Sequence, residues 1–480
     1  MKKVFGIAAL LLALAACNKI ETGNLPAENT EGIPFTASIS LGDNAATKAL
    51  AENGSTVTAT WEVGEKVALI HNGVSDEMTV SSVNEGKAII TGTITGSPAD
   101  GDPVTIIYPS SAADGTTGNI KADLLYAQNG LLTGAGSISK NYDARKGSGT
   151  LKVAGTATLD GRVSLTNQFA IFKFTVNNFD GSAAISAKPL IVTIGTQDYV
   201  ITPAAAKDVL YAALPAVSGE KVSFDVTDGS DRTYTCAKLS ASFVAGKYYQ
   251  TTLKMREYVD LGIVVGGKKI KWATCNVGAS KPEDYGDYFA WGATIPFYAE
   301  GNSQNNPCYD WISGKTGYDW TSYPFMLFGM SNWSYITKYT VADDRLSGIW
   351  YDGGGNFIGD NKTVLDFADD AARANWGGSW RMPTYAEMVE LLALSREWVT
   401  YEGVKGYRFT GSNGKTLFLP AAGYRDNVYL YDAGIFGLYW SSSLSEDLSA
   451  YARGVLFYDT GVDRGYEDRY YGRSVRPVSE

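Results

Sequence analysis

Residues 167–176 read NQFAIFKFTV, an almost unbroken run of aromatic, β-branched and other apolar residues, and they predict a β-strand. Similar short runs recur through the first half of the chain, which is rich in Thr, Val, Ala, Ser and Gly and has almost no helical periodicity. Many short strands separated by turn residues are typical of β-sandwiches. The expected strands are Pro34–Ser40, Lys66–Ile70, Ala88–Ile94, Val104–Tyr108, Phe169–Val176, Leu190–Thr193, Lys221–Val226 and Tyr248–Met255.

Aromatic usage divides the chain near residue 256, because only Trp61 among the eleven tryptophans precedes this point. A Gly-, Ser- and Asn-rich stretch from Tyr126 to Lys152 marks an earlier boundary. At roughly 100–200 residues per domain, the length allows two to four domains. We therefore expect a leader at residues 1–17, a tether at 18–32, β-sandwiches at 33–152 and 153–256, and a third domain at 257–480.

The N-terminus has the pattern of a lipoprotein leader. A basic start is followed by an apolar run from Val4 to Ala13 and by Leu14-Ala15-Ala16-Cys17. The apolar run is roughly half of the ~20 residues that cross a bilayer. We expect Cys17 to become the acylated first residue of an outer-membrane protein of a Gram-negative bacterium, anchored by lipid and facing the cell surface. An inward-facing anchor stays open.

Two helices are expected in the last 220 or so residues, a length near that of one domain. Thr384 and Glu387 form a Thr-x-x-Glu capping box ahead of Met388, Leu391 and Leu392, which predicts a helix from Thr384 to about Leu394. A second helix is expected over residues 366–375, with acidic residues in its first turn and glycine beyond its end.

Composition excludes several function classes. The net charge of −10, without clustered Lys and Arg, disfavours nucleic acid as a partner. His71 is the only histidine, so imidazole-based nucleophile systems and multi-histidine metal sites are not expected, and we place it at a strand end near the surface. Either a Cys275–Cys308 disulfide or three buried thiols, with Cys236 the third, fits the cysteine spacing.

Several motifs of the first half resemble fimbrillin-like proteins, the Mfa-like subunits of type V pili. They are FTA at 35–37, ATKA at 46–49, TWEVGEKV at 60–67, NQFAIFKFTV at 167–176 and FVAGKYYQTTLKM at 243–255. The resemblance covers residues 33–255 and implies assembly by strand exchange with other pilin subunits. It also implies that cleavage after Lys48 would release the first strand, although Lys48 as a plain surface residue is the alternative.

The second half resembles the major paralogous domain first named from Fibrobacter succinogenes. Its blocks are VDLG at 259–262, KWATCNVGA at 271–279, PEDYGDYFAWG at 282–292, WGGSWRMPT at 376–384, LPAAGYR at 419–425, YWSSS at 439–443 and GRSVRPV at 472–478. This resemblance implies an irregular α+β fold of the C-type-lectin-like and formylglycine-generating-enzyme-like kind. The expected fold class is therefore mainly β, with two fimbrillin-like sandwiches followed by such a domain.

The same resemblance argues against catalysis. Residues 309–480 contain no cysteine for a formylglycine-generating oxidase, and His71 alone cannot supply the imidazole triad of a sulfoxide synthase. The calcium-binding triplets of C-type lectins are absent too, so we expect no catalytic residue, no metal site and no cofactor, although acidic residues of this domain could hold a structural Ca²⁺.

Candidate ligand contacts are aromatic side chains beside charged ones. Trp272, Trp291, Trp376, Trp380 and Trp440 lie within the family's blocks and are expected in the core. Two later clusters combine rings and charges, although a run of charge is usually a solvated face. The candidates are Tyr424, Arg425, Asp426, Tyr429, Tyr431, Asp463, Arg464, Tyr466, Asp468, Arg469, Tyr470 and Tyr471.

The leading expectation is a non-enzymatic surface adhesin or tip-like fimbrial subunit that binds glycan or protein through its C-terminal domain. A structural shaft or anchor subunit without its own ligand is one alternative. A glycan-active enzyme, with a facing pair of carboxylates roughly 5–10 Å apart, is the other.

Overall fold

The computed structural model describes residues 32–41, 60–298, 311–312, 314–343 and 346–480, together with the backbone of 51–53 and 56–58. The fold is mainly β. The chain forms two compact units. The first contains residues up to 41, 61–119 and 146–165, and the second contains 42–60, 120–145 and 166–480.

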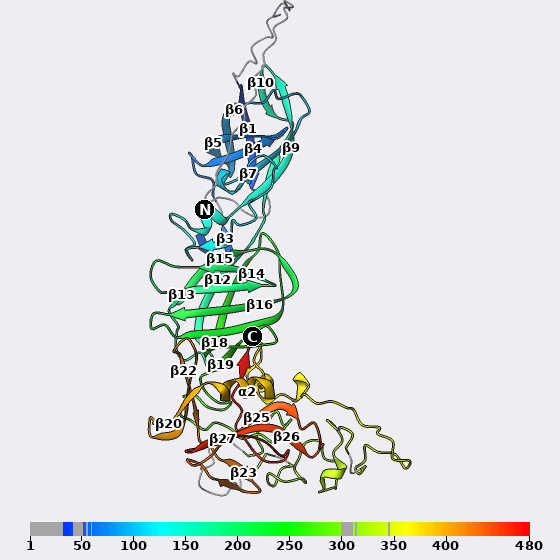
Figure 1. Ribbon diagram of the computed structural model, residues 1–480. Coiled ribbons are helices and arrows are strands. Elements are labelled where there is room, and N and C mark those ends of the chain that lie inside the picture. Colours follow the sequence, from blue (N-terminus) through cyan, green and yellow to red (C-terminus); the bar gives the residue numbers. More distant parts are fainter. Residues whose placement is uncertain are drawn as a thin grey trace, which may run out of the picture. The chain divides into compact units, whose positions relative to one another are not determined.

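The first unit is a sheet with strand order β10-β1-β11-β9-β7-β4-β5-β6, coloured blue to cyan in Figure 1. A 3-10 turn, Ser110–Ala112, follows β7. The strands are β1 Ile33–Leu41, β4 Lys66–His71, β5 Val74–Asn84, β6 Lys87–Ile94, β7 Pro103–Tyr108, β9 Arg145–Ala154, β10 Thr156–Leu159 and β11 Val163–Asn167.

Strand β1 closes this sheet, because it also pairs with β6 at the far end of the strand order. Along one edge it pairs antiparallel with β6, and along the other it pairs parallel first with β10 and then with β11. Phe35, Ala37, Ile39 and Leu41 are buried while the residues between them are more exposed, as period-two alternation requires. The first strand therefore supplies one full row of the unit's core.

The expected boundary at residue 152 falls inside β9. Residues 153–165 form the end of β9, β10 and the start of β11, and they complete the first sheet, whereas residues 120–145 belong to the second unit. No division between the two units therefore falls just after the Gly- and Ser-rich stretch 126–152. This composition accompanies short elements, β8 Ala127–Gln128 and a π-helical turn Ile138–Tyr142, before the long strand β9.

His71 ends β4 as predicted, but the prediction that it lies near the surface is wrong. It is only 2% exposed, because its strand runs through the middle of the sheet between β5 and β7. Its Nε2 lies 3.7 Å from Oδ2 of Asp76.

The second unit contains a ten-stranded sheet. Eight of its strands follow the order β15-β12-β18-β17-β16-β13-β14-β8; β19 pairs with β18, and β28 pairs with β19. A separate hairpin is formed by β2 Ala51–Asn53 and β3 Thr56–Thr58. The main strands are β12 Ala170–Asn178, β13 Ala187–Ile194, β14 Gln197–Ile201, β15 Val209–Leu214, β16 Val217–Asp228, β17 Thr233–Phe243, β18 Tyr248–Val265, β19 Lys268–Ala273 and β28 Val478–Ser479.

Strand β18 crosses the expected boundary at residue 256. Its first half pairs parallel with β12, and its second half pairs with β19. Val259, Leu261 and Ile263 from this second half lie in the same buried cluster as Met388 and Leu391. The sandwich and the C-terminal part are therefore joined by one continuous strand.

The C-terminal part contains short sheets and long loops, as expected for an irregular α+β region (Figure 1). Its sheets are β20-β21-β22, β23-β24 and β25-β26-β27. Their bounds are β20 Ser395–Tyr401, β21 Val404–Thr410, β22 Thr416–Pro420, β23 Tyr424–Asp426, β24 Tyr429–Tyr431, β25 Gly437–Leu444, β26 Tyr451–Tyr458 and β27 Gly461–Asp468. The helical elements are η3 Trp333–Tyr335, η4 Phe367–Asp369, α1 Ala371–Trp376 and α2 Tyr385–Ala393.

The predicted helix after Thr384 is confirmed. Helix α2 runs from Tyr385 to Ala393, and both hydrogen bonds of the capping box are formed between Thr384 and Glu387. The second predicted helix is shorter than expected. Residues 367–369 form a 3-10 turn, and α1 begins only at Ala371 because the side chain of Asp370, rather than that of Asp366, caps it.

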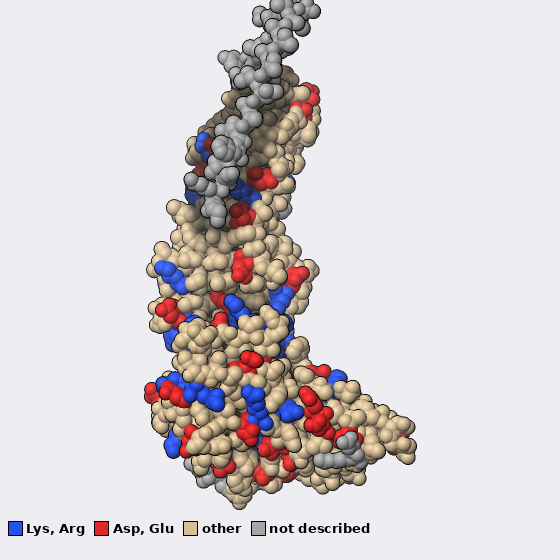
Figure 2. All heavy atoms as spheres, in the orientation of Figure 1, with Lys and Arg blue, Asp and Glu red and all other residues tan. Residues whose placement is uncertain are grey.

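The five tryptophans of the quoted blocks are core residues as predicted, each at most 8% exposed. Within the described ranges, no helix is both long and apolar enough to cross a membrane. On the face that Figure 2 shows, basic and acidic side chains are interspersed.

Candidate functional site

The first predicted cluster forms the hairpin β23–β24. Asp426 pairs with Tyr429 across the turn, and Asn427 adopts a φ of 50°, a conformation that Asn tolerates well. Gly423 precedes the hairpin with a φ of 65°. A Cβ there would lie 2.1 Å from the carbonyl oxygen of Tyr431, so only glycine allows the strands to approach this closely.

Two distant segments flank the hairpin. The backbones of Tyr318 and Asn427 exchange two hydrogen bonds of 3.0 Å, and those of Arg425 and Gly472 exchange bonds of 2.8 and 2.9 Å. Gly472 allows this contact because a Cβ there would lie 2.5 Å from the ring of Tyr318. These contacts bring Trp320 and the Tyr470–Tyr471 pair beside the hairpin.

Six rings form a continuous surface, which we call the aromatic ridge: Trp320, Tyr424, Tyr429, Tyr431, Tyr470 and Tyr471. Successive centroid distances are 6.2 Å for Tyr429–Tyr431, 5.6 Å for Tyr431–Tyr424, 5.5 Å for Tyr424–Tyr471, 4.5 Å for Tyr471–Tyr470 and 5.0 Å for Tyr470–Trp320. Tyr429 and Tyr431 are 48% and 42% exposed, and the other four rings are half-buried. The structure therefore unites five of the predicted tyrosines and adds Trp320.

The prediction that Arg425 contacts a ligand is wrong. It is 1% exposed, because it alternates with Tyr424 and Asp426 along β23 and faces inward over the rings of Tyr288 and Tyr298. Arg469 is also buried, and its guanidinium donates hydrogen bonds to carbonyl oxygens of the surrounding loops. These two cations belong to the core.

Asp463, Arg464 and Tyr466 lie on β27 and are exposed, but they do not join the ridge. The ring of Tyr466 packs 5.2 Å from that of Tyr451 on β26 and near the guanidinium of Arg453. The second predicted cluster therefore divides. Its last residues reach the ridge, and its first three form a separate polar surface.

Acidic side chains border the ridge. Burial raises the pKa of Asp468 to about 6, and the charges of Glu467 and Asp426 add to this effect. Burial also raises the pKa of Asp426, with a contribution from Asp319. The described residues contain no group of three or more His, Cys, Asp or Glu side chains arranged to hold a metal ion. The ridge thus combines ring faces with carboxylates that accept hydrogen bonds.

A cleft of about 430 Å³ lies elsewhere in the second unit, and sequence reasoning missed it. Phe179, Arg256, Cys275 and Trp376 are among its lining residues. They come from the residue after β12, from β18, from the segment after β19, and from α1. No local pattern relates positions this far apart along the chain, so only the folded structure shows the cleft.

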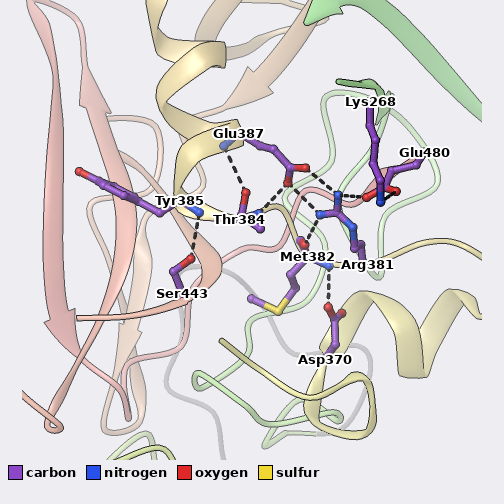
Figure 3. Close-up of polar contacts among 9 residues, drawn as sticks. All are labelled: Lys268, Asp370, Arg381, Met382, Thr384, Tyr385, Glu387, Ser443 and Glu480. Atoms are coloured by element: carbon purple, nitrogen blue, oxygen red, sulfur yellow. Dashed lines mark hydrogen bonds and ion pairs between the residues drawn. The ribbon is translucent and has the colours of Figure 1, made fainter. Parts of the chain in front are cut away.

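Arg381, within the block WGGSWRMPT, has a structural role, shown in Figure 3. Its guanidinium forms two hydrogen bonds with Glu387, of 2.8 and 2.6 Å, and a third of 2.7 Å with Glu480. Lys268 pairs with the other oxygen of Glu480 at 2.6 Å. The hydrogen bonds from Lys268 and Arg381 lower the pKa of Glu480 despite its partial burial. This network fixes the C-terminus of the chain against α2.

Three further predicted sites lie outside the described residues: Cys17, Lys48 and Cys308. Cys275 is a free thiol in the structure, as is Cys236. Burial raises the pKa of both thiols, that of Cys236 to about 12. With Cys308 undescribed, the pairing of Cys275 with it stays a prediction.

No family model matches the chain, and no curated protein matches it. Solved structures similar to it include proteins described as fimbrial and as putative cell-adhesion proteins. A fimbrial assembly protein from Parabacteroides distasonis matches over 48% of this chain and 95% of its own, with 11% identity and a TM-score of 0.28. A fimbrial protein from Bacteroides ovatus matches over 94% and 99%, with 12% identity and a TM-score of 0.23.

The fimbrial anchor protein Mfa2 from Porphyromonas gingivalis matches over 46% of this chain and 90% of its own, with 11% identity and a TM-score of 0.23. The identities and scores of all three are too low to transfer a role to this chain. The fusion to a major paralogous domain also stays a prediction.

Proposed function

We propose that this chain is a non-enzymatic surface lipoprotein, an adhesin or tip-like fimbrial subunit, that binds glycan or protein through its aromatic ridge. The observation that carries the proposal is the run of six contacting rings, two of which are more than 40% exposed. Exposed tyrosines supply large contact areas at a low cost in side-chain entropy. They therefore favour a binding surface.

The chemistry of the ridge suits a carbohydrate or a polar protein surface. Ring faces pack against the C–H faces of sugars, while the tyrosine hydroxyls and the carboxylates of Asp426 and Asp468 provide hydrogen-bonding groups at the edges. The hairpin β23–β24 is fixed by backbone hydrogen bonds from Arg425 and Asn427 to Gly472 and Tyr318, so little order would have to be gained on binding.

Acylation of Cys17 would tether this surface to the outer membrane. The test is a screen of the mature, full-length protein against a glycan array and a panel of matrix proteins. We expect at least one specific ligand. Failure to bind any glycan or protein would contradict the adhesin role.

A structural shaft or anchor subunit is the second candidate, and the position of β1 favours it. This strand lies between β6 on one edge and β10 and β11 on the other, so its removal would open a groove that an extended segment of another subunit could fill. Immunogold labelling distinguishes the roles, since a shaft subunit labels along filaments and a tip subunit labels their ends. Mass spectrometry of the surface protein would show whether cleavage follows Lys48.

A glycan-active enzyme is the third candidate, and only the raised pKa of Asp468 speaks for it. A carboxylic acid that stays protonated up to about pH 6 could act as a general acid beside Asp426. If the protein were such an enzyme, it would cleave a ligand found in the screen, and Asp468→Asn would stop cleavage while leaving binding intact. We expect the bound ligand to be recovered uncleaved.

A further inference from the structure

The cleft of about 430 Å³ in the second unit lies apart from the residues of the aromatic ridge. Its walls come from residues 178–180 at the end of β12, from 255–257 in β18, from 274–275 after β19, and from Trp376 at the end of α1. Small-molecule sites have volumes of roughly 300–1,000 Å³. The cleft is therefore large enough for a small ligand.

Arg256 is held rigidly in this cleft. Its guanidinium carbon lies 3.3 Å from the ring centroid of Phe179 and 3.7 Å from that of Trp376. Two rings at these distances cannot share one face of the guanidinium, so the group is stacked between them. Both faces are covered, and only the N–H groups in its plane remain for hydrogen bonding.

The Nε–H group of Arg256 lacks an acceptor among the described residues. Its Nε is buried and has no hydrogen-bond partner, and none of the ion pairs among the described residues includes Arg256. Burial lowers the pKa of this side chain to about 9, which leaves it charged at neutral pH. Arg256 as a whole is only half-buried, but a buried Nε–H without an acceptor is unfavourable, and a bound anion would relieve this.

Neither carboxylate that lines the cleft accepts a hydrogen bond from Arg256. Asp180 is exposed and accepts a 2.7 Å hydrogen bond from the backbone of Ser182; its charge acts on Arg256 from a distance, without an ion pair or a hydrogen bond between them. The pKa of Glu257 responds to burial and to the charges of Arg232 and Asp228, not to Arg256. Cys275 is the other titratable neighbour of the guanidinium, and its thiol stays neutral because burial raises its pKa.

We propose that this cleft binds an acidic sugar residue, with the planar N–H edge of Arg256 donating two parallel hydrogen bonds to the oxygens of its carboxylate. Arginine is the side chain best shaped for this geometry, and stacking between Phe179 and Trp376 fixes its plane in advance. Thr274 and Ser280 also line the cleft and supply hydroxyl groups to it; that of Ser280 donates a 3.3 Å hydrogen bond to Asp284 and can still accept one from a sugar hydroxyl. The site is independent of the aromatic ridge.

The test is isothermal titration calorimetry of the mature, full-length protein with D-glucuronate, and with D-glucose as the uncharged match. We expect glucuronate to bind at least tenfold more tightly than glucose, and Arg256→Gln to weaken glucuronate binding at least tenfold. Arg256→Lys keeps the charge but loses the paired N–H geometry, so it should lose most of the affinity as well.

Two further variants keep the test decisive if Arg256→Gln does not fold. Thr274→Val removes only a hydroxyl from the wall and should weaken glucuronate binding severalfold. Tyr429→Ala with Tyr431→Ala alters the ridge and should leave glucuronate binding unchanged, which separates this site from the proposed adhesin surface. The proposal would be overturned if glucuronate and glucose bound with equal affinity, or if Arg256→Gln left the affinity for glucuronate unchanged. Binding only of a peptide C-terminal carboxylate would overturn it as well.

Discussion

Arg381 and Glu387 form a two-pronged ion pair in which Nη1 donates to Oε2 at 2.8 Å and Nη2 donates to Oε1 at 2.6 Å (Figure 3). The same carboxylate accepts a 2.7 Å hydrogen bond from the backbone of Thr384 at the start of α2. One side chain therefore caps the helix and neutralises a largely buried cation.

Glu387→Ala should lower the free energy of unfolding of the second unit by about 3–5 kcal/mol, because it leaves Arg381 without its main partner and removes half of the capping box. Urea denaturation followed by tryptophan fluorescence measures this, since ten of the eleven tryptophans lie in that unit. Glu390→Ala, at an exposed position of the same helix, is the control and should cost less than about 0.5 kcal/mol. Equal losses for the two variants would contradict this account.

Ile39→Ala should destabilise the first unit by about 2–5 kcal/mol, because this buried residue of β1 closes the sheet against β6 and β11. Hydrogen exchange of the β6 amides reports the opening of that pairing directly. Thr36→Ala, on the exposed face of β1, should leave exchange nearly unchanged. Unaltered β6 protection in Ile39→Ala would show that β1 does not hold the sheet closed.

Asp468 should make the second unit less stable as the pH rises. Its pKa is about 6 in the folded protein against an ordinary value of 3.8, so the folded state binds more protons between these values and stability falls through this window. We expect the stability difference between Asp468→Asn and the unaltered protein to increase by about 1 kcal/mol from pH 4 to pH 7, after allowance for solvent screening. Denaturation curves at both pH values measure it, with Asp463→Asn as the control for loss of a charge from β27. A difference that is the same at both values would refute the assignment.

Arg469→Ala should destabilise the second unit by at least about 3 kcal/mol, because carbonyl oxygens of Lys338, Tyr339 and Ser449 would lose buried hydrogen bonds. Arg464→Ala removes an equally large cation from an exposed position and should cost less than about 0.5 kcal/mol. Thermal unfolding of the two variants compares them. Similar melting temperatures would mean that Arg469 does not have the buried role described.

The strands of the first half are predictable where local pattern alone decides them. Phe169–Val176 matches β12 to within two residues, because its dense apolar run fits a buried strand. The pairing of Phe35 with Ala157 is not predictable, since it joins positions over a hundred residues apart. That pairing moves the boundary past residue 152 and assigns β10 and β11 to the first sheet.

The candidate site was predictable in composition but not in orientation. The rings of Tyr424 and Tyr431 and the buried Arg425 occur in one short segment, and the sequence does not indicate which face of the hairpin points inward. Burial of Arg425 against Tyr298 decides this. Trp320 was missed because it reaches Tyr470 only through the pairing of Tyr318 with Asn427.

Binding by the aromatic ridge is tested most directly by comparing three forms of the mature protein against the ligand found by array screening. They are the unaltered chain, Tyr429→Ala with Tyr431→Ala, and Tyr466→Ala, whose ring is 47% exposed but off the ridge. We predict that the double variant binds at least tenfold more weakly, since the loss of two anchoring rings costs at least about 1.4 kcal/mol, and that Tyr466→Ala binds as before. Equal affinity of all three forms would contradict the account.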